Sequence, residues 1–151
     1  AISDEEFDAA YMIHVGMNIS DKESTFERVF KALKRGTNFV IYDVMKMKEG
    51  QLSFPLPWAE KEEGSAVDSL DTYVSSLERK GFEVIYSEIK KDFAIAFFRN
   101  MMQKMKGEPP PLGLHLVMGA DTPIKVQNVF RQIDQGIMAP VLLVARKVGE
   151  T

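Results

Sequence analysis

The sequence predicts an α/β domain built around a mostly parallel sheet, and three observations support this. Apolar segments that favour β structure alternate along the chain with amphipathic segments at helical spacing. The first strand, helix and strand follow one another within about 40 residues, which favours a right-handed parallel crossover. With 151 residues and 45% hydrophobic content, the chain can bury one core. We therefore expect a single domain over residues 1–151.

The first crossover lies near the start of the chain. Phe7 to Val15 is apolar without strict alternation, as in a strand that is covered on both faces. Ser20 and Glu23 have the spacing of a capping box, and the helix that follows them ends at Gly36. Asn38 to Met45 then predicts a second apolar strand.

The middle of the chain contains a loop, a helix and a strand. Lys46 to Gly64 has two prolines and the only tryptophan, which predicts a loop with some apolar content. Asp68 or Ser69 is expected to cap the next helix. Phe82 to Ile89 follows as a third strand.

The last third of the chain predicts two more helices and a strand. Phe93 to Met105 carries a broad stripe of Phe and Met at helical spacing, which is typical of core packing and alternatively of a lid over an apolar pocket. Pro109 to Pro111 interrupts regular structure. Thr122 is expected to cap a further helix with Pro123 at its first position. Pro140 to Val148 is the fourth strand.

Composition argues against several classes of function. The 22 acidic and 19 basic residues are interspersed, with a net charge of -3, so we expect no binding to nucleic acid. The chain has no cysteine and two histidines, which gives no basis for a disulfide framework or a metal site. No apolar run is long enough for a membrane span, so we expect no membrane partner and, by default, a cytoplasmic location. The start at Ala1 suggests a processed or shortened chain.

Common catalytic motifs are also absent from the sequence. It contains no GxGxxG, no Walker loop, no G-x-S-x-G elbow and no HExxH. The sequence therefore gives no evidence for a phosphate-binding loop, a serine esterase or a zinc peptidase.

Three segments resemble class I methyltransferases that use S-adenosylmethionine. The run FDAAYMIHVGMNISDKESTFERVFKALKRGTNFVIYDVM resembles the middle of that fold, including Leu33 to Thr37 in place of the LKPGG-like turn. The run ERKGFEVIYSEI resembles the junction between a helix and the sixth strand of the family, and PVLLVARK resembles the seventh strand. The order of these pieces covers nearly the whole chain.

The resemblance implies a three-layer, partial Rossmann-like methyltransferase fold. The strands are expected in the spatial order first, second, fourth and third, with the last strand antiparallel to the others. The chain would be the carboxy-terminal half of such an enzyme and would lack the half with the glycine-rich cofactor loop, since none of its ten glycines lies in a GxG. The isolated chain is then expected to bind S-adenosylmethionine poorly and to be inactive.

The resemblance and the general rule for open α/β sheets indicate where the site should lie. By resemblance, Tyr11, Met12 and His14 pass under the methionine part of S-adenosylmethionine, and His14 is the candidate catalytic base. Ligands of such sheets bind beyond the carboxyl ends of the strands. The candidates for binding a small-molecule acceptor by this rule, together with a histidine in a later apolar loop, are Asn18, Tyr42, Asp43, Trp58 and His115.

Other interpretations of these residues stay open at this stage. Each candidate could serve only in packing or in local hydrogen bonding. The domain could be a non-catalytic interaction module that uses its open sheet edge, or a carrier of apolar ligands built on the Phe and Met helix. The resemblance also implies that the strand from Phe7 to Val15 has an unpaired edge. We therefore expect self-association through this edge, with Phe7, Tyr11 and Ile13 in contact with water.

Overall fold

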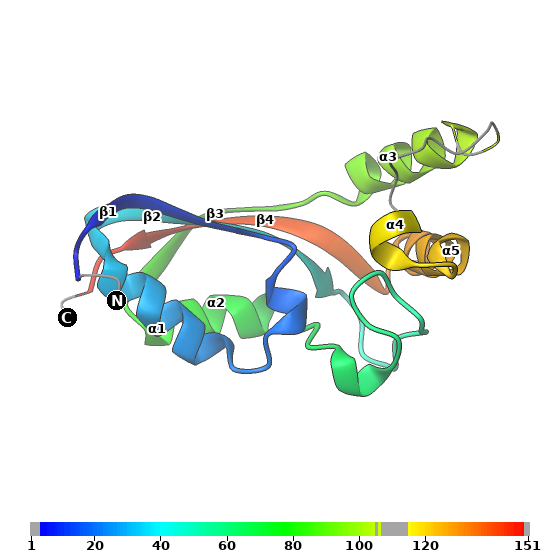
Figure 1. The fold of residues 1–151 in the computed structure, drawn as a ribbon. Helices are drawn as coiled ribbons and strands as arrows, with labels where there is room; N and C mark the ends of the chain where they lie inside the picture. Colours follow the sequence, from blue (N-terminus) through cyan, green and yellow to red (C-terminus); the bar gives the residue numbers. More distant parts are fainter. Residues whose placement is uncertain (1–3, 105, 107–114, 150–151) are drawn as a thin grey trace.

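A computed structural model describes residues 4–104, 106 and 115–149 of the chain. Within this part, four strands form one sheet in the order β1-β2-β4-β3 (Figure 1). Strands β1 and β2 are parallel, and β4 runs antiparallel to β2 and to β3. The expected order and the antiparallel last strand are confirmed. The strands are β1 (Phe7–Ile13), β2 (Leu33–Lys46), β3 (Phe82–Ile89) and β4 (Met138–Lys147).

The helices of the described part fall into two groups. Helices α1 (Lys22–Ala32) and α2 (Leu70–Arg79) lie side by side on one face of the sheet (Figure 1). Helices α3 (Lys91–Lys104) and α5 (Thr122–Asp134) pack against each other beyond one end of the sheet, next to the short α4 (His115–Met118). The described residues thus place no helix over the second face, and they supply two of the three layers of the expected fold.

Helix α1 begins one residue later than the sequence indicated. Its N-cap is Asp21, whose carboxylate accepts a hydrogen bond from the backbone N–H of Ser24 at 3.0 Å, so Ser20 is not the cap. A carboxylate also interacts favourably with the positive end of the helix. The helix ends before Gly36, because Leu33 takes an extended conformation and starts β2. For α2, the expected cap Ser69 is confirmed.

Helix α5 also differs at its first turn. Asp121 occupies the N-cap position, and Thr122 lies inside the helix, where its hydroxyl donates to the carbonyl of Gly119. Pro123 is therefore the second residue of the helix and not, as expected, the first, although it still lies in the first turn. Two predictions fall outside the described residues. They are the break at Pro109 to Pro111, within residues 107–114, and the end of the Phe and Met helix at Met105.

The main core lies between the sheet and the α1–α2 layer. Aromatic rings from both helices and from two strands meet there, with ring centroids 5.4 to 6.1 Å apart in edge-on or tilted arrangements that favour aromatic pairs. These rings belong to Phe26, Phe30, Phe39, Tyr73 and Phe82. A second cluster around Val44, Leu56 and Ile133 fills the other end of the molecule, where α3 and α5 lie.

Strand β1 is covered on one face and not on two. Met12 is buried in the main core, whereas Tyr11 is 78% exposed and Ile13 is 52% exposed on the opposite face. The expectation that both faces are covered is therefore wrong for the described residues, because α1 and α2 both lie on the same face of the sheet. The contact of Phe7, Tyr11 and Ile13 with water is confirmed.

Candidate functional site

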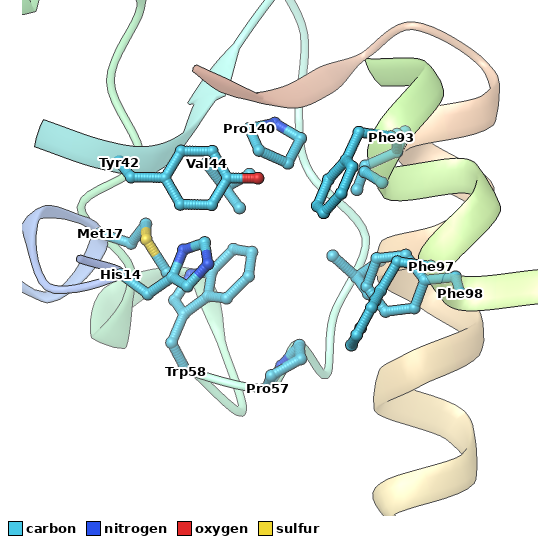
Figure 2. A pocket seen from close by; sticks show the side chains of 13 residues that line it. His14, Met17, Tyr42, Val44, Pro57, Trp58, Phe93, Phe97, Phe98 and Pro140 are labelled. Carbon is cyan, nitrogen blue, oxygen red and sulfur yellow. The ribbon is translucent and has the colours of Figure 1, made fainter. Parts of the chain in front are cut away.

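An apolar cavity of about 510 Å³ opens beyond the carboxyl ends of β1 and β2 (Figure 2). Parallel strands end at the same edge of a sheet, and Ile13 lies in register with Tyr42 on the neighbouring strand. The residue after Ile13 and the last third of β2 therefore meet at this edge. It is the edge at which open α/β sheets bind their ligands.

His14 and Tyr42 form one end of the cavity. His14 follows β1 with a positive φ of 52°, which turns the chain out of the strand and ends it before Val15. Its backbone N–H still donates to the carbonyl of Tyr42 at 2.8 Å. The two rings lie 5.1 Å apart between centroids, and Figure 2 shows both directed toward the same open space. The imidazole and the phenol are the polar groups of this end.

Trp58 belongs to a loop that helix α5 holds in place. The side-chain amide of Gln132 forms two hydrogen bonds with the backbone of Ser53, at 2.8 and 2.9 Å, and Asn128 donates to the carbonyl of Pro55 at 2.9 Å. The indole N–H of Trp58 donates to the hydroxyl of Ser65 at 3.1 Å. These bonds leave the face of the indole ring available to the cavity.

The opposite wall comes from α3, α5 and the start of β4. The backbone N–H of Lys90 donates to the carbonyl of Pro140 at 2.8 Å, which fixes the point where α3 leaves the sheet. Figure 2 shows the aromatic rings of α3 facing His14 and Tyr42 across the cavity. Among the described residues, the lining is His14, Met17, Tyr42, Val44, Pro57, Trp58, Phe93, Ala94, Phe97, Phe98, Val129, Ile133 and Pro140.

Asp43 lies behind this site and fixes the turn that carries His14. Its side chain is fully buried and accepts hydrogen bonds from the backbone N–H groups of Val15 and Gly16, at 3.0 and 3.2 Å, and from the hydroxyl of Tyr73 at 3.0 Å. Three donors on one carboxylate compensate its burial. Asp43 does not line the cavity, and the structure gives it a role in positioning the loop after β1.

The cavity carries little charge. Desolvation lowers the pKa of His14 below 6.5, although the nearby Asp43 opposes this change. Desolvation also raises the pKa of the Tyr42 hydroxyl, against a smaller effect of Lys90. Behind the cavity, burial raises the pKa of Asp43, and its hydrogen bonds counteract part of the change. No Asp, Glu, Lys or Arg of the described residues is among the lining side chains.

Of the acceptor-binding candidates, the structure brings Tyr42 and Trp58 together with His14 at this cavity. Asn18 is exposed near the same loop without lining the cavity. His115 is the first residue of α4, and its side chain is not among the described ones.

The two further candidates for cofactor contact point away from the cavity. Side chains alternate along a strand. Met12 therefore faces the core below the sheet, and Tyr11 faces the uncovered side. Of the three residues placed near the cofactor by resemblance, His14 alone is part of the cavity wall.

The sequence did not single out most of the far wall. Phe93, Phe97 and Phe98 belong to the stripe that was assigned mainly to the core and alternatively to a lid. Ala94 is the only residue of α3 that is buried, and Phe93 and Phe97 are exposed. The phenylalanines of the stripe therefore form a cavity wall, and the exposure of large aromatic side chains is the structural signal for it.

Comparison with known proteins gives a consistent result for the fold. The structure matches a putative sarcosine dimethylglycine methyltransferase from Galdieria sulphuraria with a TM-score of 0.76 and 16% identity, over 97% of this chain and 55% of that one. It also matches phosphoethanolamine N-methyltransferase 2 from Haemonchus contortus, which was solved with S-adenosyl-L-methionine. The TM-score is 0.76 and the identity 14%, over 99% of this chain and 35% of that one. The chain has part of the class I methyltransferase fold.

The same fold also occurs in a structure that is named for another reaction. The [4+2]-cyclase SpnF matches with a TM-score of 0.68 and 20% identity, over 97% of this chain and 53% of that one. The chain thus spans about half, or less, of the length of these proteins. No family model matches the sequence, and no curated protein matches it. The described residues hold no group of three or more potential metal ligands and no helix able to cross a membrane.

Proposed function

We propose that this chain takes part in methyl transfer from S-adenosylmethionine to a small-molecule acceptor and forms the acceptor side of the site. The observation that carries the proposal is the apolar cavity at the carboxyl ends of the parallel strands, with His14 at one end, in a class I methyltransferase fold. The proposal draws further support from neighbours solved with S-adenosyl-L-methionine or S-adenosyl-L-homocysteine and with small-molecule substrates.

We also propose that residues 1–151 correspond to the carboxy-terminal part of such an enzyme. The cofactor carries a carboxylate and an adenosine, which need cationic or hydrogen-bonding partners. Among the described residues, the cavity offers His14 and Tyr42 as its polar groups and no lysine or arginine. Its residues fit the methyl group and an acceptor, whereas the rest of the cofactor needs contacts that these residues do not supply. The isolated chain should therefore bind the cofactor weakly and be inactive.

The chemistry required of the protein is modest. When bound, S-adenosylmethionine supplies an electrophilic methyl group on a sulfonium. An imidazole nitrogen of His14 would take the proton that the acceptor loses on methylation. Because its pKa is lowered, His14 is neutral near pH 7 and has a free lone pair. Tyr42 and Trp58 would orient the acceptor, and the aromatic wall would exclude water.

A second candidate function is the binding of an apolar ligand without methyl transfer. One observation favours it: the described residues form this cavity by themselves, while they supply only one polar end for a cofactor. An interaction module that uses the open edge of β1 is the remaining alternative. Neither requires the chemistry of His14.

Calorimetry and a longer chain separate these functions. We expect no binding of S-adenosylmethionine to the 151-residue chain at micromolar concentration. If the upstream coding sequence encodes a strand and a glycine-rich loop, the longer chain should bind the cofactor and transfer its labelled methyl group to an acceptor from a panel of apolar alcohols and amines. A longer chain that contains the loop and does not bind the cofactor would contradict the proposal.

Variants of the longer chain test the role of His14. His14→Ala should lower turnover by about 10²–10⁴-fold, the usual contribution of a positioned general base. Its melting temperature should stay close to that of the unmodified chain, because the His14 side chain is exposed. Asn18→Ala changes a neighbouring exposed residue that does not line the cavity, so it should leave turnover unchanged. Equal turnover in both variants would assign His14 to a structural role.

A further inference from the structure

The charge of the cavity limits the kinds of ligand that it can bind. Thirteen side chains of the described part of the chain line it, and His14 and Tyr42 are the ones among them that can titrate. Both are neutral near pH 7, because desolvation lowers the pKa of the imidazole and raises that of the phenol. The cavity therefore presents no formal charge to a ligand.

Two charged groups outside the lining influence His14 and Tyr42, and both are already compensated. Asp43 is buried behind the loop and accepts three hydrogen bonds, from Val15, Gly16 and Tyr73. Lys90, which influences Tyr42, has its ammonium 2.8 Å from the carboxylate of Glu88. Neither group is directed into the cavity as a partner for an ion. A phosphate or carboxylate placed there would lose its hydration without gaining a cationic partner, which is unfavourable.

The wall opposite His14 is apolar, and its large aromatic side chains are partly exposed to solvent. Phe93 and Phe97 project from consecutive turns of α3 and are 63% and 54% exposed. Trp58 lies across the loop side of the cavity with its N–H satisfied by Ser65. Aromatic side chains contribute large contact areas to binding sites and pack well on flat or branched apolar groups.

We infer that this cavity binds an uncharged, predominantly apolar small molecule whose single polar group faces His14 and Tyr42, and that Phe93 and Phe97 determine its specificity. The identification of this molecule as the methyl acceptor rests on the proposed function, whereas its binding does not. A volume of about 510 Å³ lies within the usual range for sites of small organic ligands. Phosphorylated and carboxylated ligands are excluded by the same argument. A quaternary ammonium ion finds aromatic faces but no carboxylate among the described lining residues, so we expect it to bind more weakly than the uncharged molecule.

Trp58 makes the inference directly measurable, because it is the only tryptophan of the chain and it lines the cavity. The 151-residue chain is titrated with N-phenyl-1-naphthylamine, an uncharged probe that accepts energy from tryptophan. We expect saturable quenching of Trp58 emission. Competition then uses a matched set of one ring system: 1-naphthol, 1-naphthyl phosphate and trimethyl(1-naphthylmethyl)ammonium. The alcohol should displace the probe at least about tenfold more strongly than either ion, a difference of about 1.4 kcal/mol.

Matched variants locate the binding site. Phe97→Ala should weaken probe binding by about tenfold, the loss expected for one half-exposed aromatic contact. Phe93→Ala should do the same. Phe7→Ala removes the same side chain at the distant start of β1, where it is 43% exposed, and should leave probe binding unchanged. Circular dichroism verifies that each variant is folded.

The outcomes separate the inference from the proposed function. The inference is overturned if 1-naphthyl phosphate or the ammonium ion displaces the probe more strongly than 1-naphthol does. It is also overturned if Phe97→Ala and Phe7→Ala bind the probe equally well, or if the probe causes no saturable quenching of Trp58. If the chain binds the probe as expected and the longer chain does not transfer methyl groups, the cavity assignment stands and the proposed function fails. If the longer chain methylates an acceptor and the probe does not compete with it, the inference alone is wrong.

Discussion

Gly16 lies so close to Asp43 that a Cβ atom on this glycine would overlap with the carboxylate oxygen Oδ2, and it would also overlap with the hydroxyl of Tyr73. Asp43 and Tyr73 are both fully buried, so neither can move aside at little cost. The missing side chain at position 16 lets the backbone N–H approach Asp43 and close the turn that presents His14. The packing of this glycine is thus part of how the site is built.

The first prediction is that Gly16→Ala lowers the free energy of unfolding by about 1–3 kcal/mol, the usual cost of overpacking a buried position. Gly64→Ala is the matched control, since a Cβ there would meet only Ala59 at 3.5 Å, an ordinary contact. Urea denaturation measures both variants. Equal stability of the two would show that the turn relaxes around the added methyl group and that the close approach is not needed.

The second prediction concerns the hydroxyl of Tyr73. Tyr73→Phe removes one of three donors to the buried Asp43 carboxylate, which should cost about 1–3 kcal/mol of unfolding free energy. It should also raise the pKa of Asp43 further, because this hydrogen bond now lowers it. Tyr86→Phe is the control, since its hydroxyl is exposed and bonds only to the exposed Glu88. Denaturation curves that coincide for the two variants would refute this account of Asp43.

The third prediction is that His14 titrates below 6.5 in the folded chain. Proton NMR in a His115→Gln background, which leaves one histidine, measures this pKa directly. Because the folded pKa is depressed, the contribution of His14 to stability is complete above the unfolded value of about 6.5 and is lost as the pH falls through the folded value. Asp43→Asn should lower the pKa of His14 further, since the Asp43 carboxylate raises it. A pKa above 6.5 would remove the argument for a neutral base.

The order of the strands could be predicted from the sequence, while the ends of the elements could not. Alternating apolar strands and amphipathic helices identified the crossover, and the resemblance supplied the antiparallel last strand. At the start of α1, Ser20 and Asp21 are both good caps, and only the observed geometry shows that Asp21 reaches the N–H of Ser24. In β1, both faces of the segment are apolar, so the pattern alone predicted a strand covered on both faces, and it was the resemblance that predicted the exposure of Tyr11.

The site was predictable where it depends on strand ends and not where it depends on distant contacts. The rule for ligands in open sheets directed attention to the carboxyl ends of β1 and β2, and His14 and Tyr42 line the cavity there. The sequence could not show that Asp43 is buried, because its donors lie 27 to 30 positions away, on Gly16 and Tyr73. A helical stripe also does not reveal what it faces, so the cavity wall formed by Phe97 was assigned mainly to the core.

The last prediction concerns the edge of the sheet. Strand β1 pairs with β2 on one side and, within the described residues, has no partner on the other. An edge strand presents unpaired backbone N–H and carbonyl groups that can pair with another chain. Tyr11 and Ile13 add an exposed apolar surface next to this edge. We therefore expect the 151-residue chain to form a dimer or a larger assembly through β1.

Sedimentation over a range of concentrations tests this association. Ile13→Lys places a charge beside the open edge of β1 and should shift the chain toward the monomer, because a buried unpaired ammonium is costly in an interface. Ile89→Lys is the matched control: Ile89 is 53% exposed, close to the 52% of Ile13, but it lies on β3 at the opposite edge of the sheet. This variant should associate like the unmodified chain. A chain that is monomeric at all concentrations, or that dissociates only with Ile89→Lys, would show that the edge of β1 is not the surface through which the copies meet.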